Sequence, residues 1–161
     1  MSKTIYPILL LGLVAAAGCD ETTASGGVLT IGFNTAGDPN SFQALEEGGS
    51  VPVVVGTQGA LMLVGAVESN QFGDIDTIEA VFELKTPDGE SMARYKFRRK
   101  VVVDSDGYIY LHDVFLVVEE SAARTGAFAD RDATLHVTLQ RVGGGGANHS
   151  QVGVRLSLTE Q

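Results

Sequence analysis

Thr77-Ile-Glu-Ala-Val-Phe-Glu-Leu84 is the clearest structural signal in the chain, because apolar side chains occupy every second position. The apolar set is Ile78, Ala80, Phe82 and Leu84. A β-strand directs alternate side chains to opposite faces, whereas a helix repeats every 3.6 residues. The segment therefore predicts a strand with one face in a core and Thr77, Glu79 and Glu83 on the solvent face.

The same alternation returns at 133–141 and 151–159, which we predict as two further strands. Other stretches are rich in apolar, β-branched or aromatic residues and complete the predicted set: 28–33, 51–55, 60–67, 92–103 and 108–118. Segment 60–67 is almost continuously apolar, which is typical of a central strand covered on both faces. Pro52 lacks an N–H group and indicates an edge strand or the start of a strand.

Turn residues separate these strands, notably Thr86-Pro87-Asp88-Gly89 and Asp104-Ser105-Asp106-Gly107. Four glycines at 143–146 link the last two strands, and only 119–130 has any helical option. The pattern predicts an all-β fold, an antiparallel β-sandwich of seven to eight strands that is Ig-like in architecture. A small closed barrel is the alternative.

Composition limits the function classes. A chain of 161 residues with 44% hydrophobic residues supports one compact domain. Eleven Lys and Arg against 20 Asp and Glu give a net charge of −9, which argues against non-specific nucleic-acid binding. The single cysteine, Cys19, excludes an internal disulfide and any multi-cysteine zinc site.

The amino terminus reads as an export signal. Lys3 precedes an apolar run from 5 to 17, followed by small residues up to Gly18. Thirteen helical residues rise about 20 Å, which is short of the ~30 Å hydrocarbon core of a bilayer. Small residues directly before Cys19 resemble the lipobox of bacterial lipoproteins. An ordinary secretory signal with an incidental cysteine is the alternative.

That resemblance implies a cleaved signal peptide at 1–18, with Cys19 as the first mature residue and the carrier of acyl chains such as palmitate. Residues 19–27 would then form the lipid anchor and a flexible tether, and 28–161 the β-sandwich domain. Cleavage removes one lysine and no acid, so the mature net charge is −10. The lipid on Cys19 would hold the domain at the membrane.

Segment 32–64 resembles a group of uncharacterised lipoproteins of Gram-negative bacteria. The shared marks are Gly-Asp-Pro-Asn-Ser-Phe at 37–42, Ala-Leu-Glu-Glu-Gly-Gly at 44–49 and a Gly-x-Gln-Gly signature at 56–59. This chain has Ala60 where a second glycine is usual. The resemblance implies no particular activity. Gln58 either fixes the turn before the buried strand by a backbone hydrogen bond or contacts a ligand in a cleft.

Metal ligation has weak support. His112, His136 and His149 show no i, i+2 or i, i+4 spacing, so a transition-metal site is not expected. His112 shares a predicted face with Val114 and so reads as a core or rim histidine. Asp104 and Asp106 are calcium candidates, because they place two carboxylates on alternate residues of one turn. Asp-capped hairpin turns explain the same residues.

Catalytic signatures are also weak. The sequence has no Gly-x-Ser-x-Gly motif, and Ser150 beside His149 lies next to a glycine-rich loop that would hold a triad poorly. We therefore expect no enzyme and no cofactor.

Residues 94–100 contain five of the 11 basic residues of the chain. Alternation puts four of them on one strand face: Arg94, Lys96, Arg98 and Lys100. Arg99 falls on the apolar side. One interpretation is a docking stripe for an acidic partner or an anionic polysaccharide. The other is a solvated face whose charges answer Glu79 and Glu83 on a neighbouring strand and deter edge aggregation.

These observations predict a lipid-anchored protein of the cell envelope, at the periplasmic face or outer surface, that acts as a binding module. The expected partners are the membrane, through the lipid on Cys19, and an envelope protein or anionic glycan. The alternative is a small-ligand or calcium-binding envelope protein. A hydrolase on the same scaffold would need a cleft with a carboxylate pair or an organised histidine.

Overall fold

A computed structural model describes residues 27–56, 59–73, 75–118 and 130–158. In these ranges the chain forms strands and one short 3-10 helix, η1 (Pro39–Ser41). The strands are β1 (Leu29–Phe33), β2 (Gln43–Ala44), β3 (Gly49–Val55), β4 (Leu61–Ser69), β5 (Ile75–Lys85), β6 (Ser91–Val102), β7 (Ile109–Val117), β8 (Arg131–Arg141) and β9 (Ala147–Leu158). The prediction of an all-β chain is confirmed.

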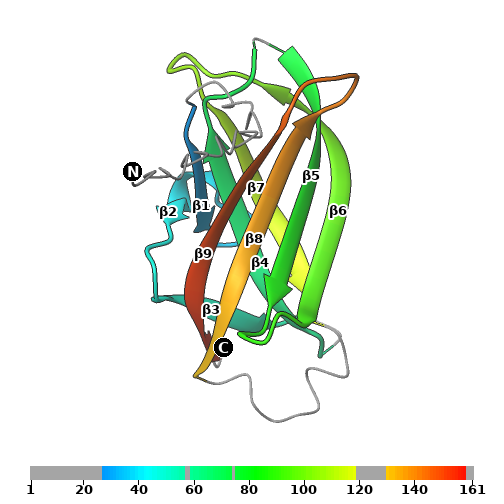
Figure 1. Cartoon of the computed structure of the whole chain (residues 1–161). Helices are drawn as coiled ribbons and strands as arrows, with labels where there is room; N and C mark the ends of the chain where they lie inside the picture. Colours follow the sequence, from blue (N-terminus) through cyan, green and yellow to red (C-terminus); the bar gives the residue numbers. More distant parts are fainter. Residues whose placement is uncertain (1–26, 57–58, 74, 119–129, 159–161) are drawn as a thin grey trace, which may run out of the picture.

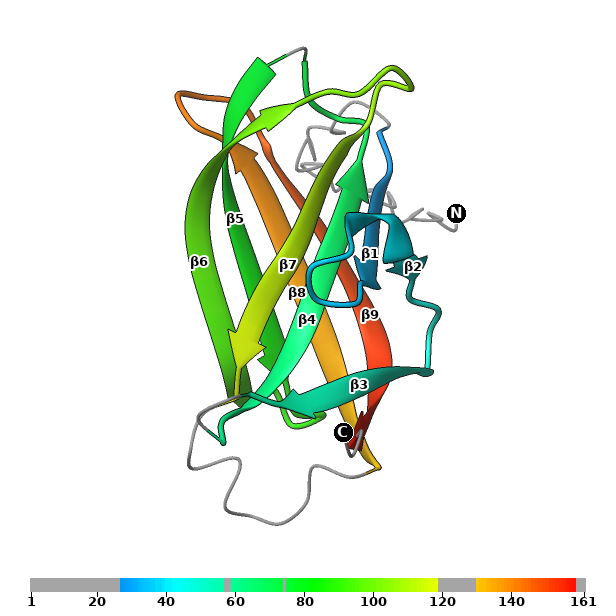
Figure 2. The ribbon, with the colours of Figure 1, turned by 180° about the vertical axis from the view of Figure 1, so that it is seen from behind.

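All nine strands belong to one sheet that curls into a half-barrel (Figures 1 and 2). β7 pairs with one edge of β4, while β1 and β3 share the other edge, β1 along 65–69 and β3 along 61–63. The order then continues through β9, β8, β5 and β6. As a result the short β2 ends one branch of the sheet, and β6 and β7 are its two long end strands.

The pairing differs from a purely antiparallel sandwich at one place. β3 and β9 run parallel, with Gly49 opposite Val154 and Val53 opposite Leu158, whereas the other pairs are antiparallel. Pro52 therefore lies in an interior strand and not in an edge strand. The β3–β4 ladder begins only at Val53, so the missing N–H of Pro52 removes no bond from that ladder.

The concave side of the sheet holds the core. It is filled by the apolar residues that the alternation placed inward, among them Phe82, Leu84, Leu135, Leu139 and Leu156, all fully buried. β4 is buried at every position from Leu63 to Val67, and so on both of its faces there, as its continuous apolar run predicts. Each Å² of apolar surface buried on folding contributes about 25 cal/mol, so this packing is the main term that stabilises the fold.

The predicted turns form at the expected places. Gly89 and Gly107 close the two Asp-Gly turns with φ of 88° and 84°, a region that favours glycine. Three glycines of the β8–β9 connection, Gly143 to Gly145, also have positive φ. Of the segment 119–130, the one stretch for which the sequence allows a helical turn, residues 119–129 lie outside the described residues. In the described ranges, no helix has the length and apolarity to span a bilayer.

Candidate binding surface

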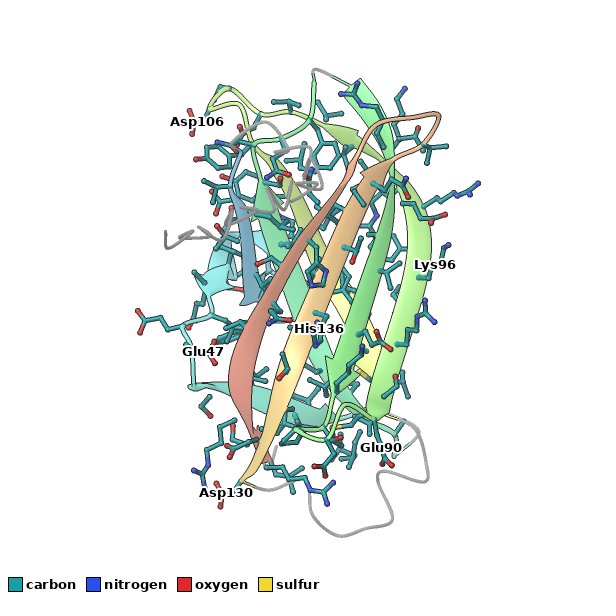
Figure 3. All side chains as sticks on the ribbon, viewed as in Figure 1. Glu47, Glu90, Lys96, Asp106, Asp130 and His136 are labelled. Atoms are coloured by element: carbon teal, nitrogen blue, oxygen red, sulfur yellow. The ribbon has the colours of Figure 1, made fainter. Side chains whose placement is uncertain are left out.

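The basic residues of β6 line up on its solvent face as predicted. Arg94, Lys96, Arg98 and Lys100 are all exposed, and they alternate with side chains that face the inside of the curl. Figure 3 shows Lys96 projecting outward from β6, away from the sheet. We call these four residues the basic stripe. β6 is an end strand, so the stripe runs along a free border of the sheet.

Glu79 of β5 neutralises the middle of the basic stripe. Its two carboxylate oxygens contact Lys96 Nζ at 2.7 Å and Arg98 Nε at 3.0 Å. The hydrogen bond from Lys96, followed by that from Arg98, lowers the pKa of the Glu79 carboxyl below its usual value. Glu83, the other expected counter-charge, contacts Lys85 at 3.3 Å instead.

The ends of the basic stripe lack such a contact in the part of the chain that the structure describes. Among the residues the structure describes, neither Arg94 nor Lys100 has a carboxylate within 4 Å. Ion pairs with the neighbouring strand therefore account for Lys96 and Arg98. They do not account for Arg94 and Lys100. Both stand where a partner in solution can reach them.

The inner side of β6 carries an aromatic cluster. The Tyr95 and Phe97 rings lie 5.2 Å apart, and Phe97 stacks on the core residue Phe82 at 6.2 Å. Arg99, predicted on the apolar side, sits over the Phe97 ring at 5.4 Å, within range for a cation–π contact. Tyr95 is nevertheless 46% exposed, although it faces the concave side. The curl is therefore open to solvent at the middle of β6.

A groove of about 330 Å³ lies at this opening, between the two end strands. β6 contributes the aromatic cluster with Arg94 and Arg99, and β7 contributes Asp113, Val114, Phe115 and Val117. Phe115 and Val117 are 42% and 52% exposed, which is unusual for such large apolar side chains. The groove is thus apolar at its base and basic at its β6 border.

Asp113 fixes the shape of β7 beside the groove, and sequence reasoning missed it. The β4–β7 ladder shifts register between Gly65 and Val67, and Asp113 there has a φ of 53°. Its Oδ1 accepts from Asn34 Nδ2 at 2.8 Å and from the Gly37 N–H at 3.0 Å. These hydrogen bonds, the one from Gly37 first, lower the pKa of the Asp113 carboxyl. The only sequence signal was an aspartate inside a strand, where it is disfavoured.

The same irregularity overturns the predicted face of His112. The ring stacks on Tyr110 at 5.8 Å and is half-buried on the convex side, whereas Val114 and Leu116 point into the core. The extra residue changes the alternation between positions 112 and 114. His112 therefore does not share a face with Val114.

The other histidines lie on the convex face of adjacent strands. The His136 and His149 rings are 5.7 Å apart, and Thr138 Oγ1 lies 3.2 Å from His149 Nδ1. Partial burial lowers the pKa of His136, and Lys85 and His149 add to this effect. Within the described ranges, no three His, Cys, Asp or Glu side chains are grouped so as to hold a metal ion.

The two calcium candidates lie in the turn between β6 and β7. Asp104 Oδ1 accepts hydrogen bonds from the Asp106 N–H and the Tyr108 N–H, both at 2.9 Å. Asp106 Oδ1 lies 3.4 Å from Ser105 Oγ. Asp104 thus stabilises its own turn, the role that an Asp-Gly hairpin turn requires. Two other predicted site residues, Gln58 and Cys19, lie outside the described residues.

Comparisons with known proteins complete this description. No family model matches the chain, and no curated protein matches it. Among solved structures, the CooA pilin subunit from enterotoxigenic Escherichia coli is 9% identical, with a TM-score of 0.35 over 81% of this chain and 99% of that one. The N-terminal domain of PorA is 11% identical, with a TM-score of 0.33 over 81% and 97%. Both TM-scores are too low to indicate a shared fold.

Proposed function

We propose that this chain is a lipid-anchored binding module of the cell envelope, which holds an acidic envelope protein or an anionic glycan against the basic stripe of β6. The observation that carries the proposal is a pair of exposed cations at the two ends of a free sheet border, Arg94 and Lys100, neither of which has a carboxylate within 4 Å among the described residues. In a chain of net charge −9, five basic residues within 94–100 form a local reversal of sign. Such a reversal steers and orients a partner of opposite charge.

The anchor belongs to the same proposal. Export, cleavage before Cys19 and acylation would place the domain on the periplasmic face or outer surface. The mature net charge of −10 would repel anionic headgroups, so attachment would depend on the lipid. Binding suits this arrangement, because the basic stripe offers positive charge along an accessible strand border.

Charge reversal tests the basic stripe. In the full chain, Arg94→Glu with Lys100→Glu should reduce the yield of crosslinked partner in intact cells about tenfold. Two attractive contacts become repulsive in this variant. Lys85→Glu with Arg155→Glu is the matched control, since it changes the net charge equally on other strands. Equal losses in the two variants, or none in the first, would contradict a role for the stripe.

A further inference from the structure

The two end strands of the sheet face each other without pairing. β6 pairs only with β5 and β7 only with β4 among the described strands, although a short turn connects β6 to β7. Figure 2 shows the two strands separated over most of their length and drawn together at the lower end. Every second residue of an end strand directs its N–H and C=O away from the sheet, where a further strand can bind them.

With respect to the described residues, the side chains beside the middle of this free border are exposed. Tyr95 and Arg99 face the concave side and are exposed, while Ala93 and Val101, on the same face nearer the strand ends, are buried. The gap is therefore local to the middle of β6, where the groove of about 330 Å³ lies. Its apolar lining would be desolvated by side chains from an added strand.

β5 shows what kind of strand β6 accepts on its other border. Glu79 and Glu83 lie opposite Arg98 and Arg94 on the convex face. Between them, Ala80 and Phe82 lie opposite Phe97 and Tyr95 on the concave face. An alternation of acidic and apolar residues therefore matches both faces of β6. Arg94 and Lys100, which have no carboxylate within 4 Å among the described residues, favour the same chemistry on the free border.

We infer that the free border of β6 binds an extended acidic segment of a partner protein by strand addition. Its apolar side chains enter the groove over Tyr95 and Phe97, and its carboxylates face the basic stripe. This inference rests on the proposed function and specifies how the partner is recognised. Main-chain hydrogen bonds give affinity in this mode, and alternate side chains give specificity.

A synthetic peptide provides the probe. We would use a peptide of about ten residues, the length of a long strand, in which Glu alternates with Ile, Phe or Leu. The control peptide has the same composition and charge, with the acidic and apolar residues in separate blocks. Binding to the purified full chain is measured by fluorescence anisotropy, and amide hydrogen exchange reports on β6.

The alternating peptide should bind, and its affinity should fall as the salt concentration rises. Its binding should also slow the hydrogen exchange of amides within 93–100. The block peptide should bind at least about tenfold more weakly, because it cannot satisfy both faces of β6. Equal binding of the two peptides, or binding that leaves β6 exchange unchanged, would overturn strand addition. Pairing of β6 borders between two copies, seen as a dimer that excludes the peptide, would overturn it as well.

Two tyrosine variants locate the site. Tyr95→Ala should lower the affinity for the alternating peptide about tenfold, because Tyr95 lines the groove. Tyr110→Ala removes a tyrosine that is 36% exposed and lies outside the groove lining, and it should leave affinity unchanged. Equal effects of the two variants would place the peptide elsewhere.

The two proposals fail separately. If Arg94→Glu with Lys100→Glu abolishes crosslinking in cells but neither peptide binds, the basic stripe docks a partner by some other mode and strand addition is wrong. If the alternating peptide protects β6 while charge reversal leaves the cellular partner bound, the stripe is not the natural contact and the proposed function is wrong.

Discussion

Asp113 shows how one side chain shapes the candidate surface. It occupies a backbone conformation with a φ of 53°, which aspartate tolerates better than most residues. From there its carboxylate binds both Asn34 and the Gly37 N–H, and Asn34 Oδ1 in turn accepts from the Asp113 N–H at 3.2 Å. The β7 irregularity and the 34–37 segment therefore hold each other in place beside the groove.

Asp113→Ala should lower the free energy of unfolding by about 2 kcal/mol at pH 7, because two hydrogen bonds to a charged acceptor are lost. The pKa of Asp113 is lowered in the folded chain, so its stabilisation is fully present above about pH 4 and fades as pH falls through the lowered pKa. Urea unfolding at pH 7 and pH 3 measures this. The difference from wild type should shrink at pH 3, and Asp132→Ala, an exposed carboxylate on β8, should show little effect at either pH.

The alternation of apolar and polar residues correctly predicts which face of the sheet a side chain occupies in β5 and β6. It fails at the irregularity around Asp113 in β7. It placed the basic stripe and Arg99 correctly, because β5 and β6 pair in register from Ile75 to Leu84. It failed for His112, because a single extra residue reverses all later faces of a strand. That insertion depends on Asn34 and Gly37, which lie more than 70 residues away along the chain.

At the scale of elements, β1 depends on the close approach of β2. Gly32 pairs with Ala44, and a Cβ on Gly32 would lie 2.5 Å from the Gln43 carbonyl oxygen and would also meet the Phe42 ring. Because the obstacle is partly backbone, a side-chain rotation cannot relieve it. The short β2 strand and the η1 turn before it therefore require glycine at this position.

Gly32→Ala should destabilise the chain by about 2 kcal/mol, as overpacking against backbone does. Gly146→Ala is the control, because its added Cβ would meet nothing within 4 Å and its φ is not positive. That substitution should change stability by less than about 0.5 kcal/mol. Thermal unfolding of both variants measures the difference. Similar unfolding midpoints would contradict the prediction and show that β2 shifts at little cost to accommodate the added Cβ.

Local sequence signals predict where the strands lie, but they do not predict which strands pair with each other. The periods and turns placed the strands to within a few residues, since alternation and Asp-Gly turns act locally. The parallel β3–β9 pair could not be inferred, because pairing depends on which borders remain free after the hairpins form. The groove between β6 and β7 depends on the same global closure, so the sequence located its basic border and not its apolar base.

At the scale of the whole molecule, the proposed attachment to the membrane rests on one residue, Cys19. Cys19→Ser in the full chain should abolish acyl labelling and move the protein from the membrane fraction to the soluble fraction, because no other lipid acceptor is expected. Fractionation with a labelled fatty acid measures both effects. Ser25→Ala in the same segment is the control and should change neither. Retention of label and membrane association by Cys19→Ser would refute the anchor.

The parallel pairing of β3 with β9 also determines when the fold can form. Among the described strands, β9 alone joins the group of β1, β2, β3, β4 and β7 to the group of β5, β6 and β8. Its partner β3 lies about a hundred residues earlier along the chain, and non-local contacts of this kind are typical of domains that fold slowly. The two halves of the sheet cannot join until β9 has been synthesised. A chain with this topology therefore cannot complete its sheet by local hairpin formation alone, because the two groups of strands unite only when β3 and β9 meet.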